Sequence, residues 1–317
     1  MPLMKLEKVV QIIYDNLPAL IIVGLVGLLL GSLKGFTVYQ HARVRRNPLV
    51  QSALRSPGQS LLTRLGELDQ KVDAHLVYLL LTPLLLYAFY LSYLYFGRKT
   101  ISLEGSLIIG LPCFGLTVFF LLRWRRHLEE RRNIRIEYEG EVSVGQELNR
   151  LMLEGYCVYH DFQADDFRID HIVVGPKGVF SVETKARSRP TTRGQSLGAV
   201  VEYNGRALIY PHGTDVNTIN QAERQASWLS NWISSNAGES VMVMAVVALP
   251  GWYVKRTSPE GIPVINPKQF RSLLKYVRSK PLNDEVIIRI VLPFEKKCGN
   301  AEAAIDQDQV PDQPQIN

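Results

Sequence analysis

The stretch RIDHIVVGPKGVFSVETK, from Arg168 to Lys185, decides the fold of the C-terminal half of this 317-residue chain. Two runs rich in β-branched and aromatic residues, 168–174 and 179–185, flank the sequence Gly-Pro-Lys-Gly at 175–178. Such runs on either side of a connection that contains glycine and proline are typical of a β-hairpin. The stretch therefore predicts two neighbouring antiparallel strands.

A symmetric connection fixes which residues of this hairpin face each other. Val174 then pairs with Val179, and Asp170 lies directly opposite Glu183. Because side chains alternate between the two faces of a strand, the charged residues gather on one face. That face carries Arg168, Asp170, Ser181, Glu183 and Lys185, and the other carries Ile169, Val173, Phe180 and Val182.

The opposition of Asp170 and Glu183 points to a metal site. Directly opposed residues have β-carbons roughly 4.5–5.5 Å apart, and like charges at that distance are destabilising. A hard divalent ion such as Mg²⁺, or Mn²⁺, would relieve the repulsion and would activate a water as a Lewis acid. Lys185 on the same face would orient that water or stabilise phosphate charge. The alternative is a hairpin with one dry and one solvated face, which explains the charges but not their opposition.

The surrounding region, 137–297, consists of short elements separated by Gly, Pro and Asn. A helix with apolar residues at Val144, Leu148 and Leu151 ends at Gly155, and a strand at 156–160 follows. The elements expected after the hairpin are one or two strands in 200–210, a helix at 217–233, a buried strand at 241–249, a helix at 268–279 and a last strand at 285–292. This order predicts an α/β sandwich with a mixed sheet, and the polar tail 298–317 is expected to be disordered.

The hairpin stretch resembles the core of the nuclease-related domain (NERD) family, which is similar to restriction endonucleases with a D…(D/E)-x-K signature. The resemblance covers roughly residues 137 to 295, including Gly145-Gln-Glu147-Leu and Asn217-Thr-Ile-Asn-Gln221. It implies a restriction-endonuclease-like α/β/α domain that cleaves phosphodiester bonds. Asp170 and Glu183 would bind Mg²⁺ or Mn²⁺, Lys185 would be the catalytic lysine, and Glu147 would be a further metal ligand. Thr218 departs from the family, which usually has proline there.

Several residues near the hairpin have two interpretations. Glu147 flanks the apolar stripe of its helix and is equally well a surface glutamate. Gln221 contacts nucleic acid or, as the spacing Thr218-x-x-Gln221 favours, closes a capping box. His171 lies on the apolar face and is expected to be a packed histidine rather than a base. The loop after the hairpin carries three arginines that either contact phosphates or stay solvated, Arg187, Arg189 and Arg193.

The N-terminal part, 1–126, reads as a membrane domain with three charge-free apolar runs at 17–33, 76–96 and 106–122. Each run is about long enough to cross a bilayer. Basic residues gather between the first two runs and again from Arg123 through the linker 127–136. The positive-inside rule then predicts a multi-pass protein of the cell (inner) membrane with a cytoplasmic C-terminal domain. This topology also accounts for much of the net charge of +6.

Together these features predict a membrane-anchored, metal-dependent nuclease whose partners are the lipid bilayer and nucleic acid, DNA first. The alternative is a catalytically silent module, tethered to the membrane, that binds nucleic acid or a protein. The three cysteines lie far apart, at positions 113, 157 and 298, so they provide neither a metal-binding motif nor a disulfide framework. The sequence identifies no protein partner.

Overall fold

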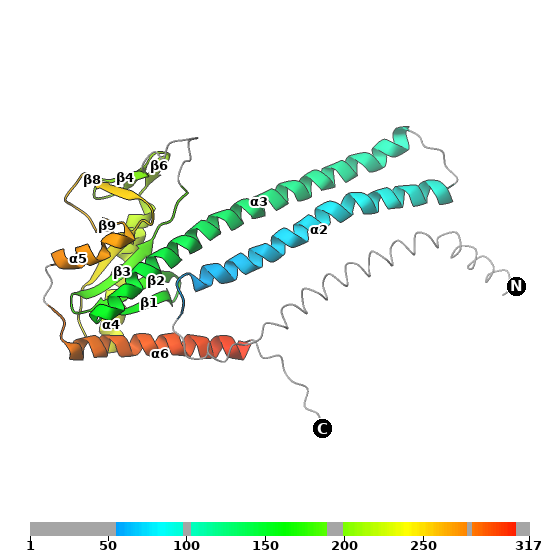
Figure 1. Ribbon diagram of the computed structural model, residues 1–317. Coiled ribbons are helices and arrows are strands. Elements are labelled where there is room, and N and C mark those ends of the chain that lie inside the picture. Colours follow the sequence, from blue (N-terminus) through cyan, green and yellow to red (C-terminus); the bar gives the residue numbers. More distant parts are fainter. Residues whose placement is uncertain (1–54, 98–102, 189–198, 278–280, 309–317) are drawn as a thin grey trace, which may run out of the picture. The chain divides into compact units, whose positions relative to one another are not determined.

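A computed structural model describes residues 55–97, 103–188, 199–277 and 281–308 of the chain (Figure 1). The chain forms two compact units. Of the described residues, 67–97 and 103–131 belong to the first unit, and 55–66, 132–188, 199–277 and 281–308 belong to the second. The expected span 17–33 and the arginines Arg189 and Arg193 lie outside the described residues.

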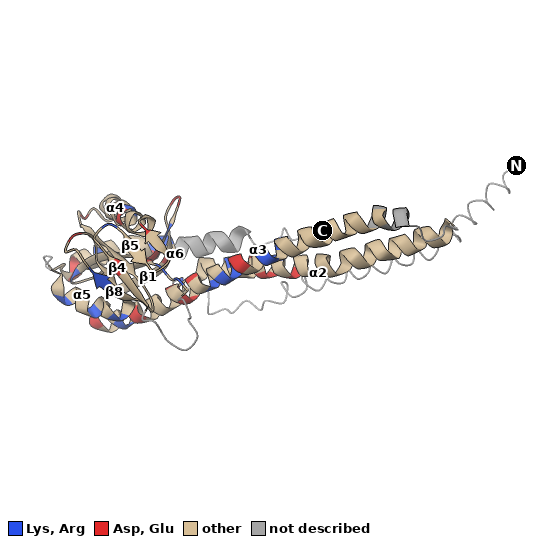
Figure 2. Cartoon of the chain, turned by 90° about the horizontal axis from the view of Figure 1, so that it is seen from above, with Lys and Arg blue, Asp and Glu red and all other residues tan. Residues whose placement is uncertain are grey.

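The first unit is built from parts of two long helices, α2 (Gln59–Phe96) and α3 (Leu103–Asn149). Within this unit the rings of Tyr78 and Phe120 lie 5.7 Å apart, and Arg131 forms an ion pair with Asp69. Figure 2 shows that α2 carries no Lys, Arg, Asp or Glu along the stretch that includes the expected span 76–96.

One helix of the described ranges, α2, is long and apolar enough to cross a membrane, as judged by length and composition. Its most apolar window has a mean hydropathy of 1.8, and none of that window is buried. The expected span 106–122 lies inside α3, which does not meet the same criterion among the described residues. Among the described residues the structure therefore contains one candidate span where two were expected, and the expected span 17–33 is not tested.

The second unit contains a five-stranded sheet in the order β1-β2-β3-β7-β9. β1, β2 and β3 pair antiparallel, whereas β3, β7 and β9 pair parallel, so the sheet is mixed as predicted. A smaller sheet has the order β6-β5-β4-β8. The strands are β1 (Cys157–Gln163), β2 (Arg168–Gly175), β3 (Gly178–Thr184), β4 (Val200–Tyr203), β5 (Leu208–Tyr210), β6 (Gly213–Asp215), β7 (Val243–Ala248), β8 (Tyr253–Arg256) and β9 (Val264–Ile265).

Helices cover both faces of the larger sheet and give three layers. One apolar cluster joins Ile172 and Val174 to α4 (Asn217–Ala237) and α6 (Asp284–Asp308). The other joins the strands to the end of α3, to η2 (Arg150–Glu154) and to α5 (Phe270–Tyr276), which follows the short element η3 (Pro267–Gln269). Val173, Phe180 and Val182 lie in this second cluster as expected. Ile169 instead lies in the first cluster, at a position where β2 is paired with Phe162 of β1.

The expected last strand at 285–292 is wrong, because these residues belong to the helix α6. Its buried side chains recur at helical spacing, at Ile287, Ile290, Val291, Phe294 and Cys298. Asn283 accepts a hydrogen bond from the N–H of Val286 at 2.9 Å and so caps the first turn. The helix continues to Asp308, so the part of the tail up to that residue is helical rather than disordered.

The start of α2 is part of the second unit. Leu61 is buried there, and Gly58 lies against the ring of Tyr138. Gly145 of α3 lies so close to Pro57 that any β-carbon at position 145 would collide with the proline ring. The α/β domain therefore includes a segment that precedes the expected boundary at residue 137 by many residues.

Candidate active site

The β2–β3 hairpin has the predicted register. Val174 pairs with Val179, and the ladder runs from Gly175–Gly178 to His171–Val182. The same register, continued, places Asp170 opposite Glu183. At this end the carboxylate of Asp170 accepts a hydrogen bond from the backbone N–H of Thr184 at 2.8 Å. The carboxylate is thereby fixed at the position where the β2–β3 ladder has ended.

Glu183 is held from the opposite side by two amides of α4. Gln221 donates to its Oε1 at 2.9 Å, and Gln225 donates to its Oε2 at 2.8 Å. Residues four apart lie on one face of a helix, so both amides reach the same carboxylate. The capping box expected for Gln221 is therefore wrong. Asp215 takes its place at the helix start, since it accepts from the N–H of Thr218 at 3.1 Å.

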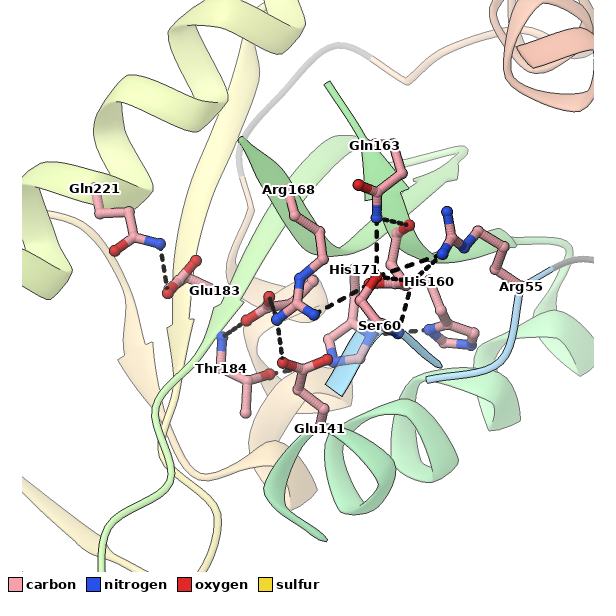
Figure 3. Close-up of polar contacts among 12 residues, drawn as sticks. Arg55, Ser60, Glu141, His160, Gln163, Arg168, His171, Glu183, Thr184 and Gln221 are labelled. Atoms are coloured by element: carbon pink, nitrogen blue, oxygen red, sulfur yellow. Dashed lines mark hydrogen bonds and ion pairs between the residues drawn. The ribbon is translucent and has the colours of Figure 1, made fainter. Parts of the chain in front are cut away.

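Arg168 lies among three carboxylates (Figure 3). Its guanidinium forms ion pairs of 2.6 Å with Glu141, 3.2 Å with Asp161 and 3.4 Å with Asp170. Although burial opposes it, these acidic neighbours raise the pKa of Arg168. Arg168 is therefore a permanent internal cation at the acidic end of the hairpin.

Asp161 links this arginine to the start of α2. It is fully buried and has a positive φ of 51°, which is uncommon for a residue other than glycine. Its Oδ2 accepts from the backbone N–H and the hydroxyl of Ser60 at 3.2 and 2.8 Å, and it lies 3.0 Å from the guanidinium of Arg55. These contacts hold Asp161 in place, and the guanidinium groups of Arg55 and Arg168 offset its charge.

The acidic groups outnumber Arg168, and their pKa values reflect the imbalance. Burial, followed by the charge of Asp170, raises the pKa of Glu141 to about 8. Burial raises the pKa of Asp170 to about 6 despite the opposing effect of Arg168. Burial and the charge of Asp170 raise the pKa of Glu183 well above its ordinary value. The three carboxyl groups thus interact as one site that retains protons or attracts a cation.

Glu141 is a site residue that the sequence interpretation missed, and it takes the place expected for Glu147. Glu147 pairs with Arg150 at 3.1 Å, six residues or about 9 Å farther along α3. Glu141 lies on the same helix face as the buried residues Val144 and Leu148. An acidic residue on an apolar helix face is the sequence feature that could have identified it. The adjacent Gly140 lets the helix approach Ala186, where a β-carbon at position 140 would collide.

The site does not contain a complete set of metal ligands from protein side chains, but it has oxygen donors that suit a divalent metal ion. In the ranges that the structure describes, no three His, Cys, Asp or Glu side chains converge as a metal site. One oxygen of Glu141, Oε2, is buried and has no hydrogen-bond partner. Mg²⁺ usually takes only one or two protein carboxylates and keeps several waters. Asp170 and Glu183, with the free oxygen of Glu141 beside them, therefore fit Mg²⁺ or Mn²⁺.

Lys185 follows β3 and lines an open pocket. Its backbone N–H donates to Ala248 at 3.0 Å, which fixes the direction of the chain. Burial raises the pKa of Glu183, and the charge of Lys185 partly offsets that rise, so the ammonium group acts on the carboxylate site. Arg187 lines the same pocket and forms a 2.6 Å ion pair with Asp215.

His171 is buried as expected, within a polar chain that the sequence did not predict. Its Nδ1 lies 2.8 Å from Nδ1 of His160, and its Nε2 lies 3.1 Å from the hydroxyl of Thr184. Burial lowers the pKa of His171 well below its ordinary value and that of His160 to about 4. Both rings are therefore neutral near pH 7 and support Thr184, the residue whose N–H binds Asp170.

Comparison with protein families relates the region that holds the site to a known domain. A family model described as "Nuclease-related domain" matches residues 136–250. Searches of curated proteins and of solved structures gave no match, so the likeness to the restriction-endonuclease fold stays a prediction. The matched segment holds Glu141, Asp170, Glu183 and Lys185, and it ends before α6. Residues 136–250 of this chain are therefore similar to the nuclease-related domain family.

Proposed function

We propose that this chain is a membrane-anchored, metal-dependent nuclease that hydrolyses phosphodiester bonds, with DNA as its first substrate. The observation that carries the proposal is the pair of buried carboxylates, Asp170 and Glu183, whose charges interact at the open end of the hairpin. Lys185 follows two residues after Glu183 and lines an adjoining pocket. A cation, a basic side chain and a solvent-filled approach are what phosphodiester hydrolysis requires.

Each residue has a distinct role in this proposal. Asp170 and Glu183 hold Mg²⁺ or Mn²⁺, which when bound supplies Lewis-acid polarisation of the phosphate. The N–H of Thr184 keeps Asp170 oriented, and the two α4 amides keep Glu183 oriented. Lys185 presents its ammonium group to the phosphate or to the attacking water. Because these supports are already formed, little reorganisation is needed on substrate binding.

The test uses the full-length chain in detergent, since the start of α2 is part of the α/β domain. Supercoiled DNA and labelled RNA are incubated with Mg²⁺, Mn²⁺ or EDTA. Wild type should nick or cut DNA only with the metal, and Asp170→Asn, Glu183→Gln and Lys185→Met should each be inactive. Asp165→Asn is the matched control, because its side chain is 79% exposed and lies outside the site. If wild type and Asp170→Asn are equally inert, the nuclease proposal fails.

The proposed membrane attachment rests on α2 and on the basic residues that follow the expected third span, Arg123, Arg125, Arg126, Arg131 and Arg132. We expect a multi-pass protein of the cell membrane with its nuclease-related domain in the cytoplasm. A C-terminal tag should then resist protease added outside intact cells and should be digested after lysis. Digestion in intact cells contradicts this orientation.

A second candidate, a catalytically silent module that binds nucleic acid, is favoured by one observation. Arg168 already supplies a positive charge to Asp170 and Glu141, so the acidic groups are partly neutralised without a metal. This candidate predicts a complex with DNA that weakens steeply with salt and shows no cleavage in Mg²⁺ or Mn²⁺.

A further inference from the structure

The pocket that begins at Lys185 has features that the two-carboxylate site does not explain. Its wall is formed by the segment after β3, by the turn between β5 and β6, by Trp252 and by part of α3. Lys185, Arg187 and His212 contribute basic groups, and Glu137 is the acidic residue in the lining. The excess of basic groups favours an anionic ligand.

Arg187 is held in position within this pocket. Its guanidinium lies 2.6 Å from Asp215 and 4.3 Å above the centre of the Tyr210 ring. Asp215 is itself fixed, because it accepts hydrogen bonds from the N–H and the hydroxyl of Thr218. These bonds and the charge of Arg187 lower the pKa of Asp215, although burial opposes the change. The side chain of Arg187 keeps 39% of its surface exposed, so donors remain available.

The pocket wall also contains two buried donors without partners. Tyr210 is 7% exposed and Trp252 is 3% exposed, and their rings lie 5.2 Å apart. Neither the hydroxyl of Tyr210 nor the indole N–H of Trp252 has a hydrogen-bond partner. Buried polar groups usually have a hydrogen-bond partner, and a buried donor without one destabilises the fold. A ligand that is rich in acceptor oxygens would supply what this wall lacks.

We propose that this pocket binds a phosphodiester group next to the one that is cleaved, with Arg187 as its principal contact and Lys185 between the two phosphates. A guanidinium held on one side by a carboxylate and an aromatic ring presents its remaining N–H groups in a fixed fork, which suits phosphate oxygens. The inference rests on the proposed nuclease function, because it takes the occupant of the pocket to be a nucleic-acid strand.

The experiment measures binding without cleavage. Full-length protein in detergent is titrated into a fluorescent single-stranded oligodeoxynucleotide in EDTA, over a series of salt concentrations. Arg187→Gln should weaken binding about tenfold, as expected for loss of a hydrogen bond to a charged group. It should also lower the slope of log affinity against log salt by about 0.7, the value for one phosphate contact on a single strand. Arg206→Gln, at an exposed loop position outside the pocket, should leave both values unchanged.

A second variant guards against a folding defect. Tyr210→Phe keeps the ring and removes a hydroxyl that has no partner, so it should not lower the melting temperature. It should weaken oligonucleotide binding several-fold and leave the salt slope unchanged. If Arg187→Gln and Tyr210→Phe both bind the oligonucleotide as wild type does, the phosphate subsite is refuted. The subsite is refuted as well if Arg187→Gln weakens binding of short-chain phosphatidylglycerol and not of the oligonucleotide.

The two proposals fail in different ways. If wild type cleaves DNA with Mg²⁺ but Arg187→Gln binds the oligonucleotide normally, the nuclease function stands and the subsite does not. If wild type is inert with Mg²⁺ and Mn²⁺ but Arg187→Gln binds weakly with a reduced salt slope, the phosphate pocket stands and the cleavage proposal does not.

Discussion

Replacing Glu141 by glutamine should change how the stability of the α/β domain depends on pH. Glu141 is 3% exposed, and its pKa is raised from 4.5 to about 8, first by burial and then by the charge of Asp170. The folded domain therefore binds this proton more tightly than the unfolded chain does. The resulting stabilisation is complete below pH 4.5 and is lost as the pH rises through about 8.

The size of the effect follows from the same values. A rise in pKa from 4.5 to about 8 corresponds to about 5 kcal/mol between the two ends of the range. This figure is a ceiling, because Asp170 and Glu183 titrate in the same site and share the repulsion. We therefore expect Glu141 to account for about 2 kcal/mol, which is about 4–8 °C in melting temperature for a domain of this size.

The assay is thermal unfolding of the full-length chain in detergent, followed by tryptophan fluorescence between pH 5 and 8.5 without divalent metal. The melting temperature of wild type should fall as the pH rises. The melting temperature of Glu141→Gln should fall by about 4–8 °C less over the same range. Glu147→Gln is the control on the same helix and should follow wild type, because Glu147 pairs with Arg150 outside the site. Identical pH profiles for wild type and Glu141→Gln would refute the argument that Glu141 is protonated in the folded domain.

Three further predictions use the same preparation. Mg²⁺ should raise the melting temperature more at pH 8 than at pH 6, because Asp170 has a pKa of about 6 and its charged form binds the metal. An equal increase at both pH values, or an increase that persists in Asp170→Asn, would contradict this prediction. Arg168→Met should destabilise the domain by about 3 kcal/mol near pH 8 and by less near pH 5, because the substitution leaves carboxylates buried without their counter-ion. Unchanged stability at both pH values would disprove this prediction. Phe294→Ala should cost about 3–5 kcal/mol, whereas Leu292→Ala, at an exposed position of α6, should cost under about 1 kcal/mol, and the reverse order would exclude the helix.

Local sequence signals predicted the hairpin, its register and the helix α4. The run 168–185 fixes the pairing of Val174 with Val179 because strand alternation and the Gly-Pro-Lys-Gly connection are properties of adjacent residues. The helix at 217–233 was likewise predicted, and its buried residues Ile219, Ala222 and Leu229 recur at helical spacing. Proximity of Asp170 and Glu183 follows from the same local pairing.

The errors occur where a residue's partner is distant in the chain. The run 285–292 is rich in β-branched residues, yet it forms α6 because the burial of Ile287, Ile290 and Phe294 against the sheet outweighs strand propensity. Gln221 fits a capping box by spacing, but Asp215 supplies the cap and Glu183, 38 residues away, takes the amide. Local patterns carry no information about which distant group competes for a side chain.

The sequence alone determined the two acidic strands, their register and the lysine that follows them, since each depends on spacing within 18 consecutive residues. Only the tertiary structure decided that Glu141 rather than Glu147 joins the acidic site, that Arg168 neutralises part of it, and that the start of α2 holds Asp161. The contact of Glu141 with Arg168 links residues 27 positions apart, and the contact of Ser60 with Asp161 links residues 101 positions apart. Their formation depends on the angle at which α3 crosses the sheet and on the close approach that Gly140 and Gly145 permit, and spacing along the chain does not encode either.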